Sequence, residues 1–316
     1  MIDCIVVGIG GFIGAVCRYL IGMIPLKEGC TLVGICGGFT TFSSFALETE
    51  RCIWRLFILY LVLRLAYWLY SQARELLERD KKIMSRRGYV PEDEQQFTGN
   101  QLELLQKAAD EVQFLLDRGY AVKPVTTFIG NHYLFSERQR LALARSVSSK
   151  ESIQKRTNKE RLQTGTAYLP ETVHIDGFNT IITLEVALSG SPVFYCRDGV
   201  LRDLAGLRGT YRVIDKTQTA IALLLKKLEF LHISKAVFYL DAPVSNSGRL
   251  SGRILQCAKG YKLSVQTRII PDVDRVLEQM EGVISGDAII LNRCKSWLNV
   301  MPLVIGQNEH VWKIRL

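Results

Sequence analysis

The pattern of apolar and polar positions changes near Met84. Before this residue lie three apolar stretches, Ile5–Pro25, Thr31–Leu47 and Cys52–Tyr70. Each is about as long as the roughly 17–25 residues that a membrane-spanning helix needs. We therefore predict an α-helical segment of about three spans at residues 1–72, in the cell membrane.

The third apolar stretch is the weakest predicted span, because Arg55 and Arg64 interrupt it. A charge near the bilayer centre costs at least about 2.5–3.5 kcal/mol on insertion scales. Trp54, Trp68 and Tyr70 lie near the ends of the stretch. Aromatic residues at both ends are typical of a span that meets the membrane surface there.

After Met84 the chain has the mixed composition of a globular domain. Apolar residues recur three or four apart over Asn100–Arg118, which predicts a helix: Leu102, Leu105, Ala109, Val112 and Leu116. Ser136 and Gln139 have the spacing of a capping box before a second predicted helix, Arg138–Val147. The segment Arg145–Arg161 is basic and has no apolar period, so we predict an exposed linker or arm there.

From Glu171 onwards, short apolar runs alternate with amphipathic stretches. The predicted strands are Val173–Asp176, Lys235–Leu240 and Lys262–Ile270, and the predicted helices are Asp215–Ile233 with Asp215 as N-cap, a helix from Leu250, and Asp272–Met280. This alternation favours a parallel α/β sheet. We predict a Rossmann-like, mostly parallel sheet in a domain at residues 171–316. A juxtamembrane helix, a small helical region and a basic linker precede it at residues 73–170.

The charge distribution indicates on which side of the membrane the C-terminal region lies. The 316 residues carry a formal net charge of +9 and a pI near 9.1, which fits a nucleic acid or a membrane surface as partner and requires neither. Basic residues directly follow the third apolar stretch: Arg74, Arg79, Lys81, Lys82, Arg86 and Arg87. Such clusters usually stay on the cytoplasmic side, so we predict a cytoplasmic C-terminal region. The alternative is a solvated helix face at Ser71–Ile83.

The eight cysteines include no C-x-x-C pair. This spacing favours neither a disulfide framework nor a zinc site.

Two motifs in the apolar front section carry a family resemblance. Gly10–Tyr19 has the form GGxxGAxxRY, and Gly34–Phe45 has the form GxxGGxTTFSxF, with Glu48 following. Together they resemble the small fluoride channels of the CrcB/Fluc family. The resemblance implies a membrane protein that passes fluoride ions, with a homodimer formed through the membrane segment as a further expectation.

The same resemblance implies roles for four residues of the second motif. Gly38 and Thr41 would hold a structural Na⁺ ion, and Phe42 and Phe45 would line the fluoride path. The physics agrees, because glycine-rich backbone at membrane depth is tolerated where it lines a cavity, and aromatic ring edges carry partial positive charge. The alternative is that the glycines let helices pack closely.

The front section departs from the channel family in one respect. Family members have four spans, and the second span carries an Asn. Here only Ile24–Cys30 separates the two motifs, so that span is missing. We interpret the section as a shortened channel relative that anchors the chain in the lipid bilayer, with fluoride conduction as the alternative.

Three aspartates fall at or beside predicted strand ends: Asp176, Asp241 and Asp287, the last within the stretch Val283–Leu291, where Ser285–Asp287 precede an apolar run. Ligands of open parallel sheets bind beyond the carboxyl ends of the strands. Carboxylates gathered there repel one another unless a cation lies between them, and hard oxygen ligands suit Mg²⁺ or Mn²⁺. We predict that these aspartates hold such an ion, which activates water and clamps a phosphodiester. The alternative is that each Asp caps a helix or a turn.

Neighbouring polar residues extend this predicted site. Asn179 and Ser285 lie beside two of the aspartates, and Arg249, which follows Ser245 and Ser247, would bind a phosphate with free backbone N–H groups at a helix start. Supplementary carboxylates are available along the domain: Glu185, Asp203, Asp272 and Asp274. The loop Arg202–Arg212 is either a phosphate-facing loop or a packed connection, and His132 is interpreted as structural.

Short phrases of the domain carry two further resemblances. The phrases at Asp176–Asn179 and Ser285–Asp287 resemble the NYN branch of the PIN-like nucleases, which implies a metal-dependent ribonuclease with a Rossmann-like sheet. The chain from Met84 onwards also resembles an uncharacterised archaeal and bacterial protein family, through the phrases RRGYVPEDE, IDGFNT, RDLAGLRGTYR and DAPVSNSGR. That second resemblance implies no function.

Three hypotheses follow. The first is a membrane-anchored, divalent-metal-dependent phosphodiesterase that acts on RNA. The second is a fluoride channel with a cytoplasmic appendage. The third is a nucleotide-binding or RNA-binding module without turnover.

Overall fold

The computed structural model describes residues 86–162, 169–206, 209–306 and 310–316, together with Tyr60, Arg64, Leu65, Tyr67, Trp68 and Ser71. The chain divides into two compact units, Met1–Asp80 and Lys81–Leu316. The predicted ion and pore residues Gly38, Thr41, Phe42 and Phe45 lie outside the described residues. Among the described residues, no helix combines the length and the apolar composition that crossing a membrane would take.

A helical region begins the second unit, as predicted. Its helices are α4 (Asp93–Gln96), α5 (Gly99–Leu116), α6 (Val122–His132), α7 (Glu137–Ser146) and α8 (Lys150–Thr157). The apolar residues that predicted the first helix form its buried face, and Leu105, Ala109 and Val112 pack in one core with Val125 and Leu143. The capping box of α7 is present, because the Ser136 side chain accepts from the Gln139 N–H and the Gln139 side chain accepts from the Ser136 N–H.

A four-stranded parallel sheet follows the helical region. Its strands are β1 (Thr172–Asp176), β4 (Lys235–Asp241), β5 (Ser264–Ile270) and β6 (Val283–Ile284), in the order β5-β4-β1-β6. The helical region and the parallel α/β sheet of the predicted fold class are therefore confirmed. Asp176 is the register partner of Tyr239, so β1 ends two residues before β4 does.

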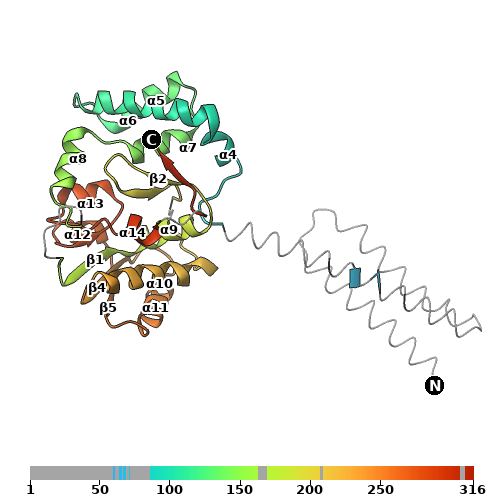
Figure 1. Ribbon diagram of the computed structural model, residues 1–316, viewed down its shortest axis with the longest axis vertical. Helices are drawn as coiled ribbons and strands as arrows, with labels where there is room; N and C mark the ends of the chain where they lie inside the picture. The colour runs from blue at the N-terminus through green and yellow to red at the C-terminus, as the bar shows by residue number, and fades with distance from the viewer. Residues whose placement is uncertain are drawn as a thin grey trace, which may run out of the picture. The chain divides into compact units, whose positions relative to one another are not determined.

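Helices cover both faces of this sheet (Figure 1). Ile175, Phe238 and Leu240 pack in one core with residues of α9 (Gly177–Leu188), α10 (Asp215–Phe230), α11 (Ser247–Ala258) and α14 (Met301–Ile305). Val237 and Tyr239 point to the opposite face, towards α12 (Val273–Leu277) and α13 (Ala288–Arg293). This separation follows from the alternation of side chains along a strand. Asp176 and Asp241 lie on the same face of the sheet as Tyr239, the face covered by α12. Asp176 is in register with Tyr239, and Asp241 lies two residues further along β4.

A second sheet joins the helical region to the α/β part. It contains β2 (Val193–Tyr195), β3 (Leu201–Asp203) and β7 (Lys313–Arg315) in the order β3-β2-β7, with β2 antiparallel to β3 and parallel to β7. Phe194 of β2 packs edge-on against Phe97, with ring centroids 5.2 Å apart. These strands were not predicted, because three residues are too few to show a period.

The predicted linker at Arg145–Arg161 is wrong. It contains α8, whose N-cap Ser149 accepts a hydrogen bond from the Ser152 N–H. Arg156 is buried, and its guanidinium pairs with Asp198, a residue distant in the sequence. A basic segment looks like an exposed arm when the carboxylates that pair with it lie far away in the sequence. Here the Asp198 carboxylate compensates for the burial of the Arg156 charge.

Three predicted boundaries also change. The helix expected from Leu250 begins at Ser247. Asp215 is the first residue of α10 and not its N-cap, because the Ile214 N–H donates to the Thr217 hydroxyl at 2.9 Å. The apolar run at residues 283–291 divides into β6 and α13.

Candidate functional site

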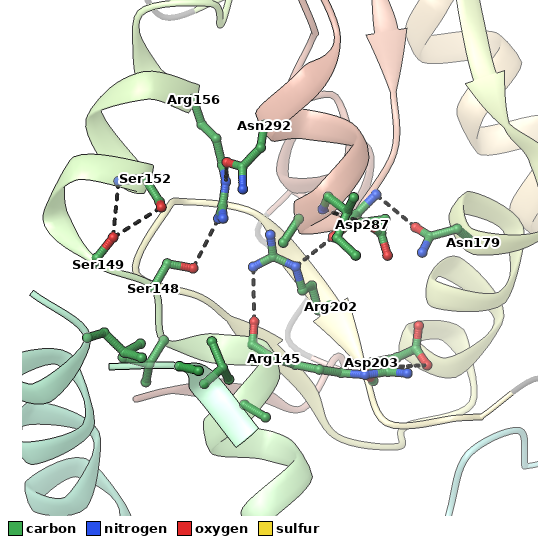
Figure 2. Close-up of a pocket in the computed structure, with 18 of the residues that line it drawn as sticks. Arg145, Ser148, Ser149, Ser152, Arg156, Asn179, Arg202, Asp203, Asp287 and Asn292 are labelled. Atoms are coloured by element: carbon green, nitrogen blue, oxygen red, sulfur yellow. Dashed lines mark hydrogen bonds and ion pairs between the residues drawn. The ribbon is translucent and has the colours of Figure 1, made fainter. Parts of the chain in front are cut away.

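A cavity of about 500 Å³ lies between the helical region and the α/β part (Figure 2). One wall comes from residues of α5, α6, α7 and α8, and the other comes from α9, β3 and α13. Ser148, Ser149 and Ser152 lie on the first wall, and Asn179, Asp203 and Asp287 belong to the second. The described lining therefore joins a polar, acidic edge of the sheet to the ends of helices from another part of the chain.

Asp287 follows β6 after Ser285 and Gly286 and is the N-cap of α13. Its Oδ1 accepts hydrogen bonds from the N–H groups of Ile289 at 2.6 Å and Ile290 at 3.2 Å. One carboxylate oxygen therefore caps the helix, which is the alternative role that the sequence left open. Asp287 is also one of the residues that line the cavity.

Asp176 closes β1, the neighbour of β6, and is joined to Asp287 through one hydroxyl. The Ser285 hydroxyl donates to Asp176 Oδ2 at 2.8 Å and accepts from the Asp287 N–H at 3.0 Å. Asp176 Oδ1 accepts from the Asn179 N–H at 3.4 Å, which caps α9. The structure thus brings together Asp176, Asn179, Ser285 and Asp287, all of which the sequence singled out.

Two glycines permit this close arrangement. A Cβ on Gly177 would lie 2.6 Å from Leu240 Cδ2 and 2.9 Å from the Tyr239 carbonyl oxygen, so α9 can start directly against β4 only with glycine there. A Cβ on Gly286 would lie 2.8 Å from Asn179 Oδ1, which accepts the Gly286 N–H at 2.8 Å. Both glycines of the recognised phrases therefore serve close backbone approach.

Burial changes the acid strength of Asp176. The pKa of this carboxyl group is raised from 3.8 to about 7, with burial as the largest cause. The carboxylates of Asp274 and Asp241 add to this shift, and the hydrogen bonds from Ser285 and Asn179 oppose it. A buried carboxylate beside other carboxylates is disfavoured in its charged form. Perturbed groups of this kind gather at functional sites, although structural networks perturb pKa values too.

Asp241 and Asp274 belong to the acidic surroundings of Asp176. Like Asp176 itself, they are not among the residues that line the cavity. Burial raises the pKa of Asp274, and the negative charges of Asp287 and Asp241 raise it further. Burial likewise raises the pKa of Asp241. In the described part of the chain, no group of three or more His, Cys, Asp or Glu side chains has the geometry to hold a metal ion. A shared cation at Asp176, Asp241 and Asp287 therefore stays a prediction.

Asp203 is a cavity carboxylate that sequence reasoning gave only a supplementary place. It ends β3, and its Oδ2 accepts from the Thr183 hydroxyl at 2.6 Å, while Oδ1 accepts from the Ala205 N–H at 2.7 Å. Burial raises the pKa of Asp203. Arg145 approaches it from α7, with Nη1 2.5 Å from the Asp203 carbonyl oxygen and 3.9 Å from Oδ1. No strand signal marked Asp203, because β3 is too short.

Two further arginines line the cavity but are committed to an internal ion pair. Arg202 donates to both carboxylate oxygens of Asp198, at 2.9 and 2.6 Å, and Arg156 donates to one of them. Arg202 Nε also donates to the Gly286 carbonyl oxygen at 2.6 Å. Of the predicted loop Arg202–Arg212, this first residue is packed, and residues 207–208 lie outside the described chain. The Asp198 pair thereby holds the loop that carries Asp287.

The remaining predicted residues lie away from the described cavity lining. Ser247 donates to the carbonyl oxygens of Asp241 at 2.7 Å and Val244 at 2.5 Å, and Ser245 and Arg249 flank it. These contacts fix the start of α11. A phosphate site at Arg249 stays a prediction. Asp272 caps α12 by accepting from the Arg275 N–H at 3.1 Å, and His132 is an exposed residue at the end of α6.

Glu185, a further supplementary carboxylate, belongs to a buried structural network. Its Oε2 lies 2.6 Å from Arg87 Nε, and its Oε1 accepts from the Tyr211 hydroxyl at 2.8 Å and from Thr217. Burial raises the pKa of Glu185, and the Arg87 guanidinium opposes that shift. The network ties the RRGYVPEDE phrase to α9 and α10, so that phrase has a structural role here.

Comparison with known proteins gives family relationships without an activity. A family described as "Domain of unknown function (DUF5616)" matches residues 167–302, and one described as "Protein of unknown function (DUF434)" matches residues 104–159. "Uncharacterized protein MJ0935" of Methanocaldococcus jannaschii is 33% identical over 209 residues, which are 66% of this chain and 99% of that protein. No solved structure matches the chain.

The predicted resemblance to an uncharacterised archaeal family is therefore confirmed. Neither a fluoride-channel family nor a PIN-like nuclease family is among the matches, so those two resemblances stay predictions. The described residues that line the cavity all fall within the two matched segments, 104–159 and 167–302.

Proposed function

The chain belongs to the same family as "Uncharacterized protein MJ0935", and we propose that it is a divalent-metal-dependent phosphodiesterase acting on RNA. The site of this activity is the acidic edge at the carboxyl ends of β1 and β6, of which Asp287 lines the cavity and Asp176 does not. Anchoring in a lipid bilayer through residues 1–72, with the remaining chain in the cytoplasm, forms part of the proposal.

The observation that carries the proposal is the linked pair Asp176 and Asp287. Asp176 ends β1, and Asp287 lies three residues beyond the neighbouring parallel strand β6. The Ser285 hydroxyl donates to the Asp176 carboxylate at 2.8 Å and accepts from the Asp287 backbone N–H at 3.0 Å. This is the position at which open α/β sheets bind their ligands. Burial and the carboxylates of Asp274 and Asp241 disfavour the ionised form of Asp176, and a cation at this edge would relieve that cost.

The donor chemistry of the site fits Mg²⁺ or Mn²⁺. Carboxylate oxygens of Asp176 and Asp287 would hold the ion, with Asp203 on the cavity wall as a further oxygen donor. Mg²⁺ usually keeps several waters and takes one or two protein carboxylates together with substrate phosphates, so three converging carboxylates are not required. When bound, the ion would supply charge stabilisation and an acidified water molecule for hydrolysis.

The protein itself supplies position and charge in this proposal. Ser285 orients the Asp176 carboxylate, and the Asn179 amide fixes the Gly286 backbone beside Asp287. Arg145, whose side chain is 38% exposed, lies beside Asp203 and would attract a phosphodiester to the cavity. Arginine is well suited to this role because its planar guanidinium matches phosphate oxygens.

Hydrolysis of labelled single-stranded RNA by the full-length protein tests the proposal. We expect cleavage that requires Mg²⁺ or Mn²⁺ and falls at least about 100-fold in Asp287→Asn, as when electrostatic stabilisation of a transition state is lost. Asp215→Asn, which changes an exposed aspartate at the start of α10, is the matched control and keeps wild-type activity.

The proposal fails if wild-type protein and Asp287→Asn are equally inert with both metals. RNA binding without cleavage would leave the third hypothesis, a binding module without turnover. Fluoride conduction, with a structural Na⁺ ion and a homodimer through the front section, concerns residues outside those described, and fluoride efflux from liposomes remains its test.

A further inference from the structure

One side of the cavity is apolar, and phosphodiester hydrolysis makes no use of it. Three large apolar residues on the cavity lining are substantially exposed: Tyr120 at 60%, Ile289 at 57% and Val122 at 40%. Exposed apolar side chains inside a concave site usually contact the apolar part of a ligand. A phosphodiester group alone would leave these side chains unused.

The three apolar residues come from both walls. Tyr120 lies in the turn between α5 and α6, and its N–H donates to the Leu115 carbonyl oxygen at 3.3 Å. Val122 is the first residue of α6. Ile289 lies on α13, two residues after Asp287, so the apolar side adjoins the proposed hydrolytic edge. A ligand that fills the cavity would meet a carboxylate edge and an apolar, partly aromatic surface within one site.

The polar lining near the apolar side favours a phosphorylated ligand. Ser148, Ser149 and Ser152 offer hydroxyl groups at the start of α8, on the helical wall of Figure 2. Arg145 is the partly exposed cation of the lining. A flat apolar group joined to a phosphate is the chemistry of a nucleotide, and base stacking on an aromatic side chain is a general way to bind single strands.

We propose that the cavity binds one nucleotide of a single-stranded nucleic acid, with its base against Tyr120 and Ile289 and its phosphate at the Asp287 edge. This inference rests on the proposed phosphodiesterase function and names its substrate class. A base inside a duplex is stacked and paired and does not enter such a cavity without being flipped out. The helical region therefore selects unpaired strands, while the sheet edge carries the chemistry.

Binding without turnover tests the inference. Fluorescence anisotropy of a short fluorescein-labelled oligoadenylate is measured with the full-length protein in Ca²⁺ in place of Mg²⁺. Tyr120→Ala is expected to weaken binding about 5- to 150-fold, which corresponds to one lost stacking contact. Tyr120→Phe keeps the ring and binds within about twofold of wild type, since the face of the ring carries the contact.

A matched control comes from the same helix as Val122. Phe128 is 66% exposed on α6 but does not line the cavity, so Phe128→Ala keeps wild-type affinity. Both aromatic residues are largely exposed, and thermal unfolding of each variant confirms that its fold is retained. The same strand annealed to its complement is expected to bind at least about tenfold more weakly, because stacking and pairing must first be broken.

Wild-type affinity in Tyr120→Ala, equal affinity for the duplex, or no binding of the single strand would each overturn the inference. If Tyr120→Ala cleaves RNA as fast as wild type, the nucleotide site is refuted and the phosphodiesterase proposal remains intact. Binding that depends on Tyr120 in a protein without cleavage refutes the phosphodiesterase proposal and retains the nucleotide site.

Discussion

Asp176 carries a proton in the folded protein under conditions in which an ordinary aspartate has lost it. Burial at the end of β1 is the main cause, and the negative charges of Asp274 and Asp241 act in the same direction. The raised pKa, about 7, means that the ionised side chain is a source of instability in the absence of a cation. A bound divalent ion would turn this unfavourable charge into a ligand.

The stability of the protein should therefore depend on pH through Asp176. Between about pH 4 and pH 7 the folded chain keeps a proton that the unfolded chain has released, so the free energy of unfolding falls as the pH rises through this window. Asp176→Asn removes the ionisation. Relative to wild type, it should gain about 2–4 kcal/mol on going from pH 4 to pH 8.

Urea denaturation in EDTA at the two pH values measures this difference. The difference in free energy of unfolding between variant and wild type is determined at each pH, and the two differences are then compared. This comparison cancels the titration of other groups and any change in hydrogen bonding that does not depend on pH. A variant that differs from wild type by the same amount at both pH values would show that Asp176 titrates as an ordinary aspartate.

At the scale of single residues, the sequence marked the ends of long strands and missed side chains from short ones. Asp176 could be singled out because a predicted strand ends at it, and Asp287 because it lies beside an apolar run. Asp203 is the last residue of the three-residue strand β3, which belongs to the second sheet, and its contact with Thr183 depends on the tertiary fold. Asp241 was expected to converge with the first two. Of the three aspartates, Asp287 lines the described cavity and Asp176 and Asp241 do not.

At the scale of elements, a buried ion network connects α8 to the β2–β3 hairpin and to the site. Asp198 lies in the hairpin turn, and its carboxylate accepts from Arg156 and Arg202. Arg202 in turn donates to the carbonyl oxygens of Arg145 at 3.1 Å and Gly286 at 2.6 Å. One carboxylate therefore holds a helix, a strand and the Asp287 loop in place.

Removing this carboxylate should be costly. Asp198→Ala leaves two buried guanidinium groups without their charge partner, so the free energy of unfolding should fall by about 3–5 kcal/mol. Asp110→Ala is the matched control, because Asp110 pairs with Arg197 while its side chain is 76% exposed, and it should cost less than about 1 kcal/mol. Chemical denaturation of both variants gives the comparison, and equal effects would contradict a structural role for the network.

The elements themselves were predictable where a period extends over several turns or residues. The long helix α5, the capped helix α7 and strands β1 and β4 all follow from such patterns. The basic segment around α8 was not, because Arg156 has its partner at Asp198, 42 residues away. A local pattern cannot reveal a charge pair that only the tertiary fold creates.

At the scale of the whole chain, the family relationship covers only part of the sequence. The matched relative corresponds to 66% of this chain and to 99% of its own length, so its counterpart here is a part of the chain rather than the whole. The unit Lys81–Leu316 holds the cavity and the segments matched by both families of unknown function. The residues that line the cavity are therefore divided between the two matched segments of this chain, and neither segment contains all of them.

Thermal unfolding of the full-length protein in a Mg²⁺ titration at pH 8 tests the central claim most directly. A site that uses Asp176 and Asp287 predicts a saturable rise in the unfolding temperature of the Lys81–Leu316 unit. At a concentration about 100 times the Kd the gain is about 2.7 kcal/mol, or roughly 5–11 °C for a unit of this size. Asp215→Asn should retain the rise and the double variant Asp176→Asn, Asp287→Asn should lose it. No rise in wild type, or an equal rise in the double variant, would contradict a divalent-ion site at this edge of the sheet.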